Sequence, residues 1–165
     1  MNYYHKWNSK LGCLHIVTDD KGLKVLAFDD NWPMFLEKMN GDIVTKKTDL
    51  HDAIIKQLSE YIKGDRKAFD IPLNPLGTDF QKSVWQSLVR IPYGEVRSYQ
   101  EQAIDIKKPK AVRAVGTANS KNPISIIIPC HRVIGKDGKL RGYAGGLGAK
   151  DVLLKLEGKV INAYK

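Results

Sequence analysis

The sequence has little cysteine. Cys13 and Cys130 are its two cysteines, which excludes a disulfide framework and a four-cysteine zinc site. A mixed metal site would have to draw on His5, Cys13, His15 and His51, but no pair of them has a usual ligand spacing. The sequence alone therefore predicts no metal.

Long apolar runs and a secretory signal are also missing. The longest apolar run, around residues 126–128, is far too short to cross a bilayer. The residues after Met1 lack the apolar stretch of a signal peptide. With 42% hydrophobic and 27% charged residues, the composition is neither that of a disordered chain nor that of a membrane bundle. We expect a cytoplasmic protein with no membrane partner.

The positive charge of the chain is confined to its second half. Net charge is +9; residues 1–75 contain 11 Lys or Arg and 11 Asp or Glu, whereas residues 76–165 contain 16 and 7. A one-sided basic region is typical of proteins that bind nucleic acid, and solubility alone is the alternative explanation. The charge balance changes beside Pro75 and Gly77, residues typical of a linker. We therefore predict two domains, residues 1–75 and 76–165.

The first half has the pattern of a small α/β domain with a structural role. Short strands are expected over residues 13–18 and 23–28, with a turn between them, and a further strand over residues 43–45. Apolar residues at helical spacing predict a helix over residues 49–63, and Asp49 is the expected N-cap.

The second half has the pattern of a mostly helical domain. Capping boxes at Thr78–Gln81 and Ser98–Glu101 predict two helix starts. Pro109 ends the second of these helices and suits the first turn of the next, which runs to about Asn119. Two short helices joined by a tight turn predict a helix-turn-helix.

The helix expected over residues 111–119 has one face suited to nucleic acid. Arg113, Gly116 and Thr117 fall opposite the apolar residues, so one long cation stands among small neighbours. Such a face can approach a nucleic-acid backbone closely, while helix N-termini and backbone N–H groups hold phosphates. An alanine-rich packed helix with a solvated arginine is the alternative interpretation.

Cys130 lies in the most unusual local sequence, between an apolar run and two basic side chains. His131 and Arg132 follow it, and neighbouring cations favour the thiolate, a soft nucleophile suited to attack at carbon. Side chains of adjacent residues usually diverge, so a water would have to carry the thiol proton to His131. An acid such as Glu157 would have to orient that ring. A buried, inert cysteine is the alternative.

The segment Pro-Cys-His-Arg-Val at residues 129–133 resembles the active-site motif of the O6-alkylguanine-DNA alkyltransferases, which are suicide DNA-repair proteins. The resemblance covers nearly all of residues 78–158 in family order and spacing. It implies an α+β fold. A small ribonuclease-H-like N-terminal domain would precede a mostly helical, winged-helix-like domain that contains the helix-turn-helix.

What the resemblance implies about chemistry is a single-turnover transfer without a cofactor. Cys130 would attack the alkyl carbon of O6-alkylguanine in double-stranded DNA after base flipping, with O4-alkylthymine as a further candidate substrate. His131, oriented by Glu157, would take the thiol proton, and Tyr99 would assist the leaving base. Asn122 would tie the second helix of the helix-turn-helix to the cysteine loop. The expected protein is a monomer.

The resemblance also implies a minor-groove interface and a base pocket. Arg113 would fill the gap that the flipped guanine leaves in the DNA stack. The implied DNA-binding residues are Tyr99, Ala111, Arg113, Gly116 and Thr117, and the implied base-pocket residues are Val133, Tyr143, Ala144 and Gly145.

Four residues depart from the family pattern. Ala144 stands where several relatives have Ser, and Lys107 where Gly commonly makes the turn. Gln102 and Asn119 occupy positions that are usually apolar. The contact at Ala144 is expected to be mainly through the backbone, so activity should survive there. The other three departures affect the packing of the helix-turn-helix and its DNA affinity rather than the chemistry.

Two other functions compete with self-alkylating repair. The chain would be a DNA-binding module without transfer if Cys130 were dispensable, although binding-only relatives have Trp at this position. A cysteine hydrolase would instead need a partner histidine remote in sequence. His5, His15 and His51 all lie in the other predicted domain.

Overall fold

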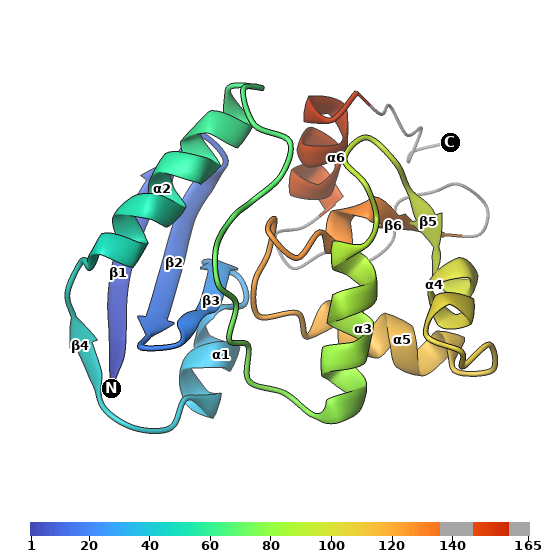
Figure 1. Cartoon of the computed structure of the whole chain (residues 1–165), viewed down its shortest axis with the longest axis horizontal. Helices are drawn as coiled ribbons and strands as arrows, with labels where there is room; N and C mark the ends of the chain where they lie inside the picture. Colours follow the sequence, from blue (N-terminus) through green and yellow to red (C-terminus); the bar gives the residue numbers. More distant parts are fainter. Residues whose placement is uncertain (136–146, 159–165) are drawn as a thin grey trace. The chain divides into compact units, whose positions relative to one another are not determined.

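The computed structural model describes residues 1–135 and 147–158. Contacts divide the chain into two units, one of Met1–Leu76 with Pro123–Ser125 and one of Gly77–Asn122 with the residues from Ile126 onward (Figure 1). Strands dominate the first unit and helices the second, so the fold is α+β. Within the described ranges, every helix is too short or too polar to span a membrane.

The first unit is built on a four-stranded sheet. Its strands are β1 (Asn2–Ser9), β2 (Gly12–Asp19), β3 (Gly22–Phe28) and β4 (Ile43–Thr45), in the order β3-β2-β1-β4. Antiparallel pairing joins β1 to β2 and β2 to β3, whereas β4 runs parallel to β1. The three strands expected from the sequence are present. The sequence pattern does not predict β1, because its aromatic and basic residues do not alternate cleanly with polar ones.

Two helices cover opposite faces of this sheet, α1 (Trp32–Lys38) and α2 (Asp49–Ile62). Tyr4 stacks on Trp32 of α1 with ring centroids 5.1 Å apart, whereas its neighbour His5 meets the ring of His51 of α2 at 6.0 Å. Because successive side chains of a strand point to opposite faces, the first unit has three layers. His5 and His51 therefore lie on the face that α2 covers.

The N-cap of α2 is Thr48 rather than Asp49, which corrects the expectation from the sequence. The Thr48 side chain accepts a hydrogen bond from the His51 backbone N–H, and the His51 ring accepts one from the Thr48 backbone N–H. An N-cap needs extended backbone, and Thr48 has φ −93° and ψ 172°. Asp49 is the first helical residue, where its negative charge suits the helix dipole.

A short segment of the second half of the sequence belongs to the first unit. The Leu26 backbone N–H donates to the carbonyl of Pro123, and the Ser125 N–H donates back to Leu26, both at 2.8 Å. Residues 123–125 therefore pair with β3, so the two units are not continuous stretches of sequence.

The second unit contains α3 (Asp79–Val89), α4 (Tyr99–Asp105), α5 (Val112–Ser120), α6 (Leu147–Leu156), the 3₁₀ turn η1 (Cys130–Arg132), and the short strands β5 (Arg97–Ser98) and β6 (Val133–Ile134). Both capping boxes are confirmed at the starts of α3 and α4. The start of α5 is not at Pro109 but at Val112, after a turn in which Lys107 has φ 63°. Gly is the usual residue at such an angle, so Lys107 adopts a strained backbone.

Gln102 and Asn119 form a reciprocal pair that joins α4 to α5. The Gln102 amide donates to Asn119 Oδ1 at 2.9 Å, and the Asn119 amide donates to Gln102 Oε1 at 2.7 Å. Gln102 also donates to the Ser87 hydroxyl of α3 at 3.1 Å. All three side chains are buried, so each polar group finds a partner away from water. Each of the two amides therefore accounts for the presence of the other at a position that is usually apolar.

Candidate active site

Cys130 is held in a buried turn of the second unit. The residue is 8% exposed and opens η1, which leads directly into β6. The Asn122 amide donates to the Ile128 carbonyl at 2.9 Å and also hydrogen-bonds the Cys130 sulfur. Asn122 therefore links the end of α5 to the loop that carries the thiol.

Glu157, which follows α6, holds the two basic residues next to Cys130. His131 Nε2 lies 2.7 Å from Glu157 Oε2, and Arg132 donates from Nε to Glu157 Oε1 at 2.8 Å. Arg132 also donates to the Ile91 carbonyl at 2.6 Å. The side chains of His131 and Glu157 are fully buried, so this network fixes the orientation of the imidazole ring.

Burial keeps both candidate proton-transfer groups neutral. It raises the pKa of the Cys130 thiol, an effect opposed by the Asn122 hydrogen bond and the positive charge of Lys150. Burial also lowers the pKa of His131, against the hydrogen bond and charge of Glu157. The resting site therefore pairs a thiol with a neutral imidazole, which is the form that can accept a proton.

Lys150 of α6 is a site residue that the sequence reasoning missed. It is 0% exposed, and burial lowers its pKa to about 8, while the neighbouring Cys130 opposes this shift. The sequence could have indicated that Lys150 faces the interior, because Leu153, Leu154 and Glu157 follow it by three, four and seven positions, which is the spacing of one helix face. A cation this close favours the thiolate of Cys130.

Residues expected to bind DNA lie on α4 and α5. Arg113 and Thr117 are exposed, and the Thr117 hydroxyl donates to the Arg113 carbonyl at 3.1 Å. Tyr99 is the first residue of α4. Its ring lies against Gly116 of α5, since a Cβ added at Gly116 would be 3.8 Å from the ring. Ala111 is half-buried at the N-cap of α5. Arg113 and Thr117 are therefore exposed on α5, whereas Gly116 is half-buried beside Tyr99.

Of the residues expected to form a base pocket, the structure describes one. Val133 is fully buried in β6 and pairs with Arg97 of β5. Tyr143, Ala144 and Gly145 lie outside the described residues. The structure thus brings Asn122, Cys130, His131 and Glu157 together around one loop, with Val133 at its end.

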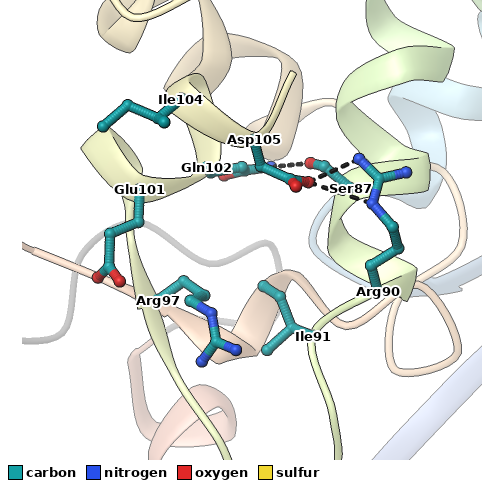
Figure 2. A pocket seen from close by; sticks show the side chains of 8 residues that line it. All are labelled: Ser87, Arg90, Ile91, Arg97, Glu101, Gln102, Ile104 and Asp105. Atoms are coloured by element: carbon teal, nitrogen blue, oxygen red, sulfur yellow. Dashed lines mark hydrogen bonds and ion pairs between the residues drawn. The ribbon is translucent and has the colours of Figure 1, made fainter. Parts of the chain in front are cut away.

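A separate cavity of about 390 Å³ opens among α3, α4 and β5 (Figure 2). Arg90 and Asp105 form an ion pair of 2.6 Å at this cavity, and Gln102 lines it together with Ser87. Its described lining does not include Cys130 or His131, so it is distinct from the thiol site.

Comparison with known proteins gives a consistent assignment for both halves of the chain. Residues 2–75 match the ribonuclease-like domain of 6-O-methylguanine DNA methyltransferase, and residues 79–159 match its DNA binding domain. The chain belongs to the 6-O-methylguanine DNA methyltransferase family. The resemblance seen in the sequence is therefore confirmed, and it extends over the first half as well.

Relatives within this methyltransferase family are similar over nearly the whole chain. A methylated-DNA–protein-cysteine methyltransferase of Methanosarcina barkeri is 50% identical over 94% of this chain and 96% of its own length. The constitutive enzyme of that name from Bacillus subtilis is 45% identical over 88% of each chain. The crystal structure of Mycobacterium tuberculosis OGT in complex with DNA superposes with a TM-score of 0.85 at 41% identity, covering 94% of this chain and 92% of the other.

Proposed function

We propose that this chain repairs double-stranded DNA by transferring the alkyl group of O6-alkylguanine to the sulfur of Cys130. The observation that carries the proposal is the arrangement of a buried thiol next to a neutral imidazole that a buried carboxylate orients. The names of its relatives and the DNA complex of one of them support the same substrate class.

The proposed step is a single displacement at the alkyl carbon. His131 takes the thiol proton through a water, the Cys130 sulfur forms a bond to the alkyl carbon, and the bond from that carbon to O6 breaks. The electron pair leaves with guanine, which takes up a proton from the Tyr99 hydroxyl. Solvent then accepts the extra proton from His131 and returns one to Tyr99. Because the thioether product is stable, each molecule reacts once.

The burial of the thiol requires the base to leave the DNA stack. At 8% exposure, the Cys130 residue is out of reach of a base that stays paired in a duplex. We infer that α4 and α5 form a helix-turn-helix that binds the minor groove, with Arg113 of α5 in the gap left by the base. The positive charge of residues 76–165 supports this surface.

The proposal also divides the labour between the two halves. Residues 76–165 would carry DNA binding and transfer, with Val133, Tyr143, Ala144 and Gly145 around the flipped base. Residues 1–75 would have a structural role. All the described groups of the thiol site, including Asn122, belong to the second unit, which supports this division.

A mass spectrum after mixing with excess duplex that carries one O6-methylguanine tests the proposal. We expect one methyl group per protein, located on the peptide with Cys130, and no further turnover. Binding without a change of mass would identify a binding module instead. Repeated release of product would identify a hydrolase.

Arg113→Ala tests the helix-turn-helix separately. We expect slower repair of duplex DNA and an unchanged rate with free O6-methylguanine, because the free base needs no flipping. Lys56→Ala, which removes an exposed cation from α2 of the first unit, is the matched control. Equal losses on both substrates would contradict the proposed role of Arg113.

A further inference from the structure

A second cluster of reactive side chains lies in the first unit, at the start of β2 and just after the end of β3. Cys13 and His15 are two positions apart on β2 and share one face of the sheet. Leu14 of β2 pairs with Phe28, the last residue of β3. Asp29 follows Phe28 and therefore lies beside Cys13 and His15. The ligand atoms of Cys13, His15 and Asp29 all lie within 4.8 Å of one another.

The contacts in this cluster converge on one nitrogen. Cys13 Sγ lies 4.0 Å and Asp29 Oδ1 2.6 Å from the same atom, His15 Nε2. A catalytic Cys-His-Asp relay would use the two ring nitrogens for different partners. Here the second nitrogen, Nδ1, is held by the Tyr4 hydroxyl at 2.7 Å. The arrangement therefore has the form of a ligand set rather than of a proton relay.

The thiol of Cys13 is also not activated as a nucleophile. Burial raises its pKa, and the negative charge of Asp29 raises it further, while Lys6 opposes both. A bound divalent cation would reverse this balance, because it binds the deprotonated thiolate and neutralises the carboxylate.

We propose that Cys13, His15 and Asp29 form a binding site for a zinc-type divalent cation. Thiolate, imidazole and carboxylate are the ligands that zinc takes in proteins, whereas magnesium and calcium prefer sites made of oxygen alone. Zinc bond lengths and tetrahedral angles place ligand atoms about 3.3–3.6 Å apart. The observed Cys13 Sγ–His15 Nε2 distance of 4.0 Å and His15 Nε2–Asp29 Oδ1 distance of 2.6 Å lie on either side of these separations.

The surroundings of His15 support its role as a ligand. Its ring stacks on Trp32, with centroids 4.9 Å apart and an interplanar angle of 4°, so the ring is held in place. With the metal on Nε2, the Nδ1–H would donate to the Tyr4 oxygen, the kind of outer contact that orients metal-binding histidines. The side chain of Asp29 is 69% exposed, which gives a cation access and leaves a fourth position for solvent.

The structure also explains why the sequence did not predict this site. His5 and His51, the other members of the mixed set considered from the sequence, lie on the opposite face of the sheet. Asp29 replaces them, and it comes next to Cys13 only through the pairing of β2 with β3.

The first test is titration of the full-length, chelator-treated protein with Zn²⁺ by calorimetry and with Co²⁺ by absorption spectroscopy. We expect one equivalent to bind and Co²⁺ to show a thiolate charge-transfer band. Cys130→Ser should keep the band and Cys13→Ser should lose it. A band that disappears with Cys130→Ser and survives Cys13→Ser would place the metal at the other cysteine and overturn the proposal.

Variants of the residues around Cys13 test metal binding without depending on whether a cysteine variant folds. Asp29→Asn alters an exposed side chain and should weaken Zn²⁺ binding sharply, whereas the neighbouring Asp30→Asn should not. Tyr4→Phe should weaken binding about 10–100-fold, because it removes the contact to His15 Nδ1. Equal affinities in the Asp29 and Asp30 variants, or no uptake by the native protein, would refute the site.

Discussion

The two cysteines of this chain lie in opposite kinds of environment. Cys130 is buried beside a cation, and the carboxylate near it belongs to an enclosed network with His131 and Arg132. Cys13 is half-buried beside an anion, Asp29, whose side chain is 69% exposed. Both sites combine a cysteine, a histidine and an acid, yet we assign them different chemistry. The burial of each site, and the atoms that its side chains bring into contact, decide whether the histidine transfers a proton or binds a cation.

The largest expected contrast is in alkyl transfer. Cys130→Ser should abolish it, because the hydroxyl is a far weaker nucleophile. Cys13→Ser should leave the transfer rate essentially unchanged, because Cys13 belongs to the first unit and not to the thiol site. The measurement is methyl incorporation from duplex DNA, read by mass spectrometry. Loss of transfer in both variants would show that the two cysteines do not differ in this way.

The two acids should differ strongly in their contribution to stability. Glu157→Gln leaves the buried Arg132 charge uncompensated and should lower the free energy of unfolding by about 3–5 kcal/mol. Asp29→Asn removes a partner whose side chain is 69% exposed and should leave the free energy of unfolding nearly unchanged. Urea unfolding of both variants measures the contrast. Similar losses of unfolding free energy in the two variants would mean that burial does not determine how much each acid contributes to stability.

The cation beside Cys130 should be visible in the pH dependence of stability. Between pH 8, the approximate folded pKa of Lys150, and its unfolded value of 10.5, the unfolded chain holds more protons. The free energy of unfolding should therefore rise by about 3 kcal/mol as pH increases through this window.

Lys150→Met should remove this rise and slow transfer near neutral pH, because the pKa of Cys130 would increase further. Lys6→Met, which removes the exposed cation beside Cys13, is the control and should leave the rise in place. An unchanged pH profile in Lys150→Met would show that this lysine is not the titrating group.

The smallest effect is expected for the amide pair that supports the second unit. Gln102→Leu alone should cost about 1–3 kcal/mol, because it leaves the buried Asn119 amide without Gln102. The double variant Gln102→Leu with Asn119→Val should recover most of this loss. A double-mutant cycle in urea measures the coupling. Strictly additive losses would mean that the two amides do not support each other.

Local signals in the sequence predicted much of the second unit. The capping boxes at Thr78 and Ser98 depend on residues three positions apart, so they could be read before any fold was known. The start of α5 could not, because Ala111 at its N-cap makes no side-chain hydrogen bond. Strand β1 was missed because its aromatic and basic residues do not alternate cleanly with polar ones, although it forms a hairpin with β2, the next strand in sequence.

The sequence by itself determined the family, the α+β class and the identity of Cys130 as the candidate nucleophile, because these follow from residue types and their order and spacing along the chain. Tertiary structure alone decided that Lys150 is buried near Cys130, that Gln102 meets Asn119, and that Asp29 joins Cys13 and His15. Each of these depends on burial or strand pairing between distant residues. Burial and strand pairing change the protonation of a side chain and the residues that it contacts, but they leave no pattern among neighbouring residues in the sequence.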